Sequence, residues 1–406
     1  MARSIPTSGA PLLCYKLRHD GLAWLFQRLR EEWELPRTAA AQAVYRGLRG
    51  VRRTLGLAPH TSVPGVAAET QALYAFYDLG VAPITFDFLW FLVGAELERQ
   101  RRGLASIRAV IVPGPRHGLR REDPGYDKAV TPSARRGRIA GILLPACDLL
   151  RSITAVTVAA SRDEAANLVE LARERVYPAR YEPALPIYPN SSGPLRAARE
   201  AGAKIGVLRA TTADLAAVDR WLAAEKIAAP PVTITLRDYE YMPERNSNYA
   251  AWTAFARRLD PMRYPIVFVP DANRCGEDLP PALSEFRVYN DAASILGLRM
   301  ALYERAYVNL GVNNGPMGLC WLDERTRYIT FKILTQTAPQ ATPEYMRHLG
   351  FEIGSSLPGG MPWQKWVWEN DELTVIEREF AAMTEVLGQQ LIGPRAPCAT
   401  IHSKAG

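Results

Sequence analysis

Arginine and amide side chains follow three predicted strands in the second half of the chain. Arg237 comes directly after the apolar run Val232 to Leu236, and Arg245 follows in the same polar loop. Because the carboxyl ends of parallel strands meet at one edge of a sheet, we expect the residues after these strands to surround one crevice. Guanidinium groups, amides and a helix N-terminus bind phosphate oxygens, so the pattern predicts a site for a diphosphate with a sugar or ribose, although each residue alone also fits a salt bridge or a turn. The members of this predicted donor site are Arg237, Arg245, Asn246, Asn248, Asp271, Asn313, Asn314, Gly315, Pro316 and Met317.

The stretch Tyr307 to Leu319, YVNLGVNNGPMGL, has the pattern of a strand, a tight turn and the start of a helix. Pro316 suits the first helical position, where its missing N–H would have no partner, and Asn314 or Gly315 can cap the helix. Such a helix N-terminus presents unpaired N–H groups and a partial positive charge, which suit a phosphate. The same residues also fit an ordinary strand-to-helix connection.

Two side chains in the first half of the chain are candidates for a general base. Asp87 lies at the end of the predicted strand Ile84 to Phe88, and His117 lies in a polar loop. Either one can take a proton from a hydroxyl group if it faces the substrate. The alternative for Asp87 is a helix cap, and the alternative for His117 is a solvated loop residue. No HExxH or GxSxG pattern occurs, and no metal site is expected.

The composition is that of a soluble globular protein. Of 406 residues, 48% are apolar and 22% are charged, and the length predicts two domains of similar size. The net charge of +7 comes mostly from arginine, which suits phosphates or an anionic membrane surface but also fits a GC-rich genome. The five cysteines are far apart without a CxxC pair, and the N-terminus lacks the apolar core of a signal peptide. We therefore expect a cytoplasmic protein, with the inner membrane face as a peripheral location.

Residues 1–65 are predicted to form a basic helical extension. The segment Gly21 to Glu34 places its leucine and aromatic side chains on one helical face, and arginines surround it. A basic amphipathic helix can lie on anionic lipid. It can equally pack on the body of the protein with a solvated basic rim.

Strands that alternate with helices predict two Rossmann-like α/β domains, at residues 66–228 and 229–390, followed by a tail at 391–406. The strands expected in the first domain are Ile84 to Phe88, Ile107 to Val112, Ile139 to Leu144 and Ala155 to Ala159. The strands expected in the second domain are Val232 to Leu236, Ile266 to Val269, Phe286 to Tyr289, Tyr307 to Val312 and Arg327 to Leu334.

Two motifs of the second domain resemble the donor-binding lobe of GT-B type glycosyltransferases. LGVNNGPMGL (Leu310 to Leu319) is similar to the turn of heptosyltransferase-like enzymes, in which a helix holds the donor diphosphate. ITLRDYEYMPERNSN (Ile234 to Asn248) is similar in position to the arginine loop of GT-B fucosyltransferases, although their His-Arg-Arg-Gly pattern is absent. The heptosyltransferase turn commonly carries an acid, then Ser or Thr, and later His, where this chain has Asn313, Asn314 and Gly318. The resemblance covers residues 231–390 and implies two Rossmann-like domains that face each other and metal-independent glycosyl transfer.

The function predicted from the sequence is transfer of a sugar from a nucleotide-sugar donor to a glycan or lipid-linked acceptor, as in polysaccharide biosynthesis. The nucleotide sugar is a substrate, so no cofactor is expected. One alternative is a nucleotide-sugar epimerase of the same fold. Another is a non-catalytic scaffold that binds a membrane or a nucleic acid through the basic extension, although few aromatic residues interleave with its basic residues, as a nucleic-acid site would need.

The segment PWQKWVWEN contains three tryptophans, Trp363, Trp366 and Trp368. Their rings could stack on a sugar or a base. They could also pack the C-terminal segment into the core, as large aromatic side chains commonly do.

Overall fold

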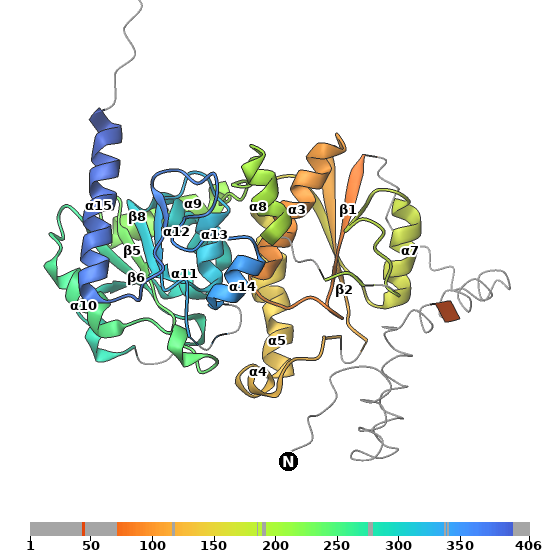
Figure 1. Cartoon of the computed structure of the whole chain (residues 1–406), viewed down its shortest axis with the longest axis horizontal. Coiled ribbons are helices and arrows are strands. Elements are labelled where there is room, and N and C mark those ends of the chain that lie inside the picture. Colours follow the sequence, from red (N-terminus) through yellow and green to blue (C-terminus); the bar gives the residue numbers. More distant parts are fainter. Residues whose placement is uncertain are drawn as a thin grey trace, which may run out of the picture. The chain divides into compact units, whose positions relative to one another are not determined.

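The computed structural model describes residues 43–44, 71–115, 118–184, 186–188, 192–274, 279–336, 338 and 341–392. Two compact units divide the chain. Unit 1 comprises Met1–Arg136 and Ser152–Asn190, and unit 2 comprises Gly137–Arg151 and Ser191–Gly406. Each unit contains a parallel sheet with helices, so the predicted α/β class with two Rossmann-like sheets is confirmed (Figure 1). The predicted helix Gly21 to Glu34 and residues 393–406 lie outside the described residues.

Unit 1 has a four-stranded sheet in the order β3-β2-β1-β4. Its strands are β1 (Ala72–Asp78), β2 (Ser106–Val112), β3 (Ile153–Val158) and β4 (Val176–Tyr177), and its helices are α3 (Asp87–Arg101), α4 (Pro124–Ala129), α7 (Arg162–Ala172) and, at the border of the units, α5 (Pro132–Arg138). The β1 side chains Tyr74 and Phe76 pack with α7, whereas the Tyr77 ring packs on Phe88 and Phe91 of α3. The two helices therefore cover opposite faces of the sheet.

Two strands predicted for the first domain are wrong. Residues 84–86 belong to a loop and Asp87 begins α3, while the first strand is the earlier β1, whose seven residues are all buried. Ile139 to Leu143 form a π-helical turn that continues into α6 (Leu144–Asp148). A short apolar run fits a buried strand or a helical turn equally well, and Pro145 suits the first turn of a helix as well as the end of a strand.

Unit 2 has a six-stranded parallel sheet in the order β10-β9-β8-β5-β6-β7. Its strands are β5 (Val232–Thr235), β6 (Ile266–Val269), β7 (Arg287–Val288), β8 (Val308–Val312), β9 (Tyr328–Phe331) and β10 (Gln364–Trp366). The helices that follow α6 are α8 (Ser192–Glu200), α9 (Thr212–Ala224), α10 (Tyr249–Arg258), α11 (Asn290–Ser294), α12 (Leu296–Arg305), α13 (Gly318–Trp321), α14 (Pro343–His348) and α15 (Leu373–Ile392). The five predicted strands are confirmed, β6 with the predicted bounds and the other four with shorter ones, and β10 was missed.

Two helix layers sandwich the sheet of unit 2. α10 and α15 supply Trp252, Phe255 and Phe380 to the core on one face (Figure 1). On the other face, Tyr303 of α12 hydrogen-bonds Thr235 at 2.7 Å and Trp321 of α13 donates to Thr330 at 3.0 Å. The strand order is that of a doubly wound sheet. From β5 the chain adds β6 and β7 on one side, and then β8, β9 and β10 on the other side, so the switch point lies between β5 and β8. A ligand site is expected beyond the carboxyl ends of these two strands.

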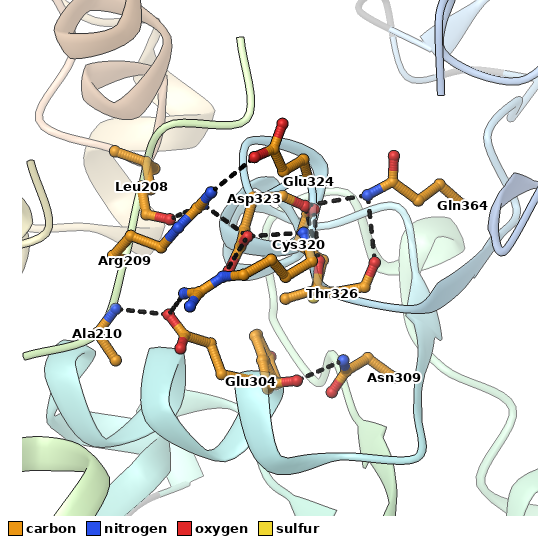
Figure 2. A network of polar contacts seen from close by, with 12 residues as sticks. Leu208, Arg209, Ala210, Glu304, Asn309, Cys320, Asp323, Glu324, Thr326 and Gln364 are labelled. Atoms are coloured by element: carbon orange, nitrogen blue, oxygen red, sulfur yellow. Dashed lines mark hydrogen bonds and ion pairs between the residues drawn. The ribbon is translucent and has the colours of Figure 1, made fainter. Parts of the chain in front are cut away.

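A polar network fastens the segment before α9 to unit 2, and Figure 2 shows it from close by. Arg209 Nη1 donates to the buried Asp323 carboxylate at 2.7 Å, and the Ala210 amide donates to Glu304 at 2.7 Å. The Leu208 amide donates to the Leu322 carbonyl at 3.1 Å, and the Arg209 amide donates to the Leu149 carbonyl at 2.8 Å. The helix α9 therefore belongs to unit 2, although the predicted domain boundary at residue 228 places it in the first domain.

Among the described residues, none of the helices combines the length and the hydropathy that a membrane-spanning segment needs.

Glu96 of α3 is a buried acid of unit 1 that is held by several hydrogen bonds. Its carboxylate accepts hydrogen bonds from Arg99 Nη2 and Gln100 Nε2, both at 2.7 Å, and from Ser152 Oγ at 2.5 Å. Burial raises the pKa of Glu96, but these hydrogen bonds outweigh it and hold the pKa below its ordinary value. Since the unfolded pKa is about 4.3, this stabilisation is complete above that pH and is lost as the pH falls through the folded pKa.

We expect Glu96→Gln to lower the free energy of unfolding by about 1.5–3 kcal/mol near neutral pH, because it removes a charged acceptor of four hydrogen bonds from three residues. The difference from the wild type should shrink as the pH falls below about 4. Urea unfolding at a series of pH values measures both effects. Glu285→Gln, which removes an exposed ion pair with Arg257, is the control and should change stability by about 0.5 kcal/mol or less. A Glu96→Gln variant as stable as the wild type at neutral pH would contradict the expectation.

Candidate functional site

The loops that follow β5 and β8 meet at the switch point of the unit 2 sheet. β5 and β8 are paired neighbours, with Val232 opposite Val308. Arg245, in the loop after β5, donates from Nη2 to the Asn313 carbonyl after β8 at 3.0 Å. The structure therefore brings these two predicted site residues together at the expected edge.

Arg237 is buried, and its guanidinium group holds its own loop together. Nη1 donates to the Met242 carbonyl at 3.0 Å and to Asn246 Oδ1, and Nη2 donates to the Tyr241 carbonyl at 2.6 Å. The Arg237 amide donates to Ser247 Oγ at 2.9 Å, and its carbonyl accepts from the Ser247 amide at 2.9 Å. The loop from 237 to 247 therefore closes around the guanidinium group.

The two arginines also interact electrostatically. Burial, and after it the neighbouring charge of Arg245, lower the pKa of Arg237 to about 10, although the negative charges of Asp271 and Asp238 oppose the shift. At that pKa, Arg237 keeps its charge at neutral pH. Two cations therefore stand close together at the switch point, and an anion beside them would relieve their repulsion.

The two asparagines of this loop build its shape. Asn246 Oδ1 accepts from the Tyr239 amide at 3.1 Å, and Asn246 Nδ2 donates to the Tyr239 carbonyl at 3.1 Å. Asn248 is the N-cap of α10 and accepts from the Ala251 amide at 3.2 Å. Both asparagines were predicted to bind the sugar donor. In the structure, both side chains form hydrogen bonds within the protein.

The turn after β8 is capped as predicted. Asn314 precedes the 3₁₀ turn Gly315–Met317, and its Oδ1 accepts from the Met317 amide at 3.1 Å. Pro316 has no N–H, and the Met317 N–H donates to Asn314. Gly315 therefore carries the remaining N–H of the turn. The turn also packs closely on β8, because a Cβ at Gly311 would lie 3.0 Å from the Thr235 carbonyl oxygen and 3.1 Å from Met317 Sδ.

Asp271 follows β6 and lies beside the loop after β5. Its Oδ2 accepts from the Asp238 amide at 3.2 Å, and Asp238 in turn accepts from Arg274 Nε at 2.9 Å. Burial, together with the charges of Asp238 and Asp271, raises the pKa of Tyr249 to about 12. A carboxylate pair thus lies next to the arginines at the same sheet edge.

Asp87 is exposed and belongs to the first turn of α3. Thr85 Oγ1 donates to Asp87 Oδ2 at 2.8 Å and accepts from the Asp87 amide at 3.3 Å. Asp87 thus stands in the first turn of a helix rather than at the end of a strand, and the N-cap position of this helix is Phe86, without a side-chain cap. His117 lies outside the described residues, and no group of three metal-ligating His, Cys, Asp or Glu side chains occurs within them.

An ion pair at this edge was missed by the sequence analysis. Lys332 follows β9, and its Nζ lies 2.8 Å from the buried carboxylate of Asp371. Lys332 lies inside the predicted strand Arg327 to Leu334, whereas β9 ends at Phe331, so the sequence did not mark Lys332 as a residue that follows a strand. Asp371 carried no signal, because an acidic residue close to the start of a helix such as α15 is ordinary.

The tryptophan segment packs into unit 2. Trp366 of β10 is buried, and its ring centroid lies 5.2 Å from that of Trp321, 5.3 Å from that of Phe351 and 6.2 Å from that of Trp368. The core role therefore applies to Trp366.

No protein-family model and no curated protein matches the chain. Among solved structures, it is similar to a glycosyl transferase of family 9 from Veillonella parvula DSM 2008, with a TM-score of 0.46 and 10% identity over 79% of this chain and 99% of that chain. The E. coli ADP-heptose lipopolysaccharide heptosyltransferase II gives a TM-score of 0.32 and 12% identity over 84% of this chain and 82% of that chain. The E. coli heptosyltransferase WaaC with ADP-2-deoxy-2-fluoro heptose gives 0.33 and 13% over 76% of this chain and 99% of that chain. All three are glycosyltransferases by name, the class that the two motifs resemble.

We expect Arg237→Met to loosen the loop after β5, because three oxygen acceptors lose their donor. The free energy of unfolding should fall by about 1–3 kcal/mol, and the Tyr239 and Ser247 amides should exchange faster with solvent deuterium. Chemical unfolding and hydrogen exchange followed by mass spectrometry measure the two effects. Arg287→Met removes an exposed arginine of β7 and serves as the control. Equal exchange rates in the two variants would show that Arg237 does not hold the loop.

Proposed function

We propose that the chain is a glycosyltransferase that binds a nucleotide-sugar donor at the switch point of the unit 2 sheet. The observation that carries this proposal is the pair of neighbouring cations, Arg237 and Arg245, at the carboxyl ends of β5 and β8. Ligands of doubly wound sheets bind at this edge, and guanidinium groups bind the oxygens of a diphosphate by charge-assisted hydrogen bonds.

The same groups suit the chemistry of the donor. When the bond from sugar to diphosphate breaks, negative charge builds on the leaving diphosphate, and preorganised positive groups lower that barrier. Arg245 and the Gly315 amide, on the loops after β5 and β8, are the proposed contacts to the phosphate oxygens. Arg237 contributes its charge from within the loop that it closes. This arrangement is proposed to act without a metal ion.

The acceptor hydroxyl must lose a proton during transfer, and Asp87 is proposed as the base. It is exposed, and it follows the loop after β1 at the carboxyl edge of the unit 1 sheet, where ligands of parallel sheets bind. The hydrogen bond from Thr85 orients its carboxylate. His117 is the second candidate. The proposed acceptor is a glycan or a lipid-linked glycan at the inner membrane face.

Nucleotide binding tests the donor site. In a thermal-shift series with UDP, GDP, ADP and CMP and their sugar conjugates, we expect one base to stabilise the protein by about 2.7 kcal/mol at 100 times its Kd. Arg245→Ala should weaken that binding about tenfold or more, because a charge-assisted contact to phosphate is lost. The control is Arg257→Ala, which removes an arginine whose ion pair with Glu285 is exposed.

If no nucleotide stabilises the folded protein, the result would contradict the proposal and favour a scaffold role. Conversion of a donor sugar without any acceptor would favour an epimerase instead.

The role of Asp87 as the catalytic base can be tested once the nucleotide of the donor is identified. Asp87→Asn should lower the rate of sugar transfer by about 10²–10⁴-fold, because the amide cannot accept the proton, while the Kd for the donor stays unchanged. The matched control is Asp163→Asn, which neutralises an exposed acid in the first turn of α7. Transfer at the wild-type rate by Asp87→Asn would exclude Asp87 as the base and direct the search to His117.

A further inference from the structure

The ion pair between Lys332 and Asp371 lies beside the loop that carries the two arginines. Asp371 is 1% exposed, and its Oδ2 accepts from the Asn248 amide at 2.7 Å and from Trp252 Nε1 at 2.8 Å. Lys332 Nζ lies 2.8 Å from the other carboxylate oxygen, Oδ1. One carboxylate thus joins the start of α10, the end of β9 and the segment that leads into α15.

Lys332 reaches the same loop directly. Its Nζ donates to the Asn246 carbonyl at 2.8 Å. Its backbone lies in the left-handed region with φ of 54°, and its amide donates to the Glu369 carbonyl at 2.9 Å. A lysine in this conformation is strained by about 1–2 kcal/mol, so its surroundings determine it. In the sheet, β8 lies between β9 and β5, so Lys332 links loops of two strands that are not neighbours.

We propose that Lys332 and Asp371 are a positioning pair that holds the loop from 237 to 248 where its arginines meet the donor diphosphate, an inference that rests on the proposed function. Asn246 transmits the effect, because its side chain accepts from Arg237 Nη1 and from the Tyr239 amide. When Lys332 holds the Asn246 backbone, it also sets the acceptor around which the Arg237 guanidinium group is arranged.

Stability alone does not account for this pair. Taking two charges out of water costs free energy that their attraction barely offsets, and well-packed apolar residues often stabilise a core as well or better. The ion pair fixes the orientation of the groups around it. The Lys332 ammonium group contacts both Asp371 and the Asn246 carbonyl, and the Asp371 carboxylate contacts Lys332, the Asn248 amide and the Trp252 indole N–H. Such shared contacts fix a loop in one position.

The test compares Lys332→Met with Lys365→Met. Lys365 of β10 forms an ion pair with Glu379 in the same unit, so its variant also removes a paired lysine but leaves the loop untouched. We expect Lys332→Met, and not Lys365→Met, to speed exchange of the Tyr239 and Ser247 amides about tenfold and to raise the nucleotide Kd about tenfold. Lys332→Arg, which keeps the charge and the donors, should restore most of the affinity.

A double-mutant cycle separates positioning from direct contact with the ligand. If Lys332 acts through the loop, Lys332→Met should change the Kd little in an Arg245→Ala background, because the contact it positions is already gone. Equal effects in both backgrounds would mean that Lys332 touches the ligand itself, and would overturn the proposal. If Lys332→Met fails to fold, Lys332→Gln, which loses the ion pair with Asp371 but can keep a donor toward Asn246, replaces it, and both the exchange rate and the Kd should then rise by a smaller factor than about tenfold.

The exchange measurement needs no ligand, so it also stands if the proposed function fails. Wild-type protein that binds no nucleotide would contradict the proposed donor site, while faster exchange in Lys332→Met would still show that the pair positions the loop. Exchange at the same rate in Lys332→Met and Lys365→Met would overturn the positioning role, whatever the nucleotide result.

Discussion

The edge of the unit 2 sheet depends on one buried guanidinium group. A buried cation must find acceptors, and Arg237 finds them in the carbonyls of Tyr241 and Met242 and in the side chain of Asn246. The ten residues that follow Arg237 are therefore folded back around it. Arg245, near the far end of that loop, is thereby brought to the turn after β8.

The neighbouring loops of this edge are fastened in the same way. Asn314 caps the turn after β8, Asp238 donates its amide to Asp271, and Lys332 with Asp371 holds the end of the arginine loop. Most polar side chains that look like ligands in the sequence are thus used to shape the site. A site built in this way is rigid before the ligand arrives, and rigidity lowers the free-energy cost of ordering on binding.

Much of the fold could be predicted from the sequence, because alternating strands and helices have local signatures. The five strands expected in the second domain and the cap at Asn314 depend on residues close together in the chain. The errors fall where local signals are ambiguous. Residues 139–143, an apolar run that fits a strand, form a π-helical turn, and β1 was passed over for a later apolar run.

The sequence by itself determined the fold class, the edge of the sheet where Arg237, Arg245 and Asn313 gather, and the turn that Asn314 caps. Only the tertiary structure decided what each of these residues does there. Arg237 donates to its own loop because burial leaves it no water, and Lys332 reaches Asp371 because β9 and α15 fold to the same edge. Hydrogen-bond partners are set by which groups are buried together, and that is a property of the packed chain.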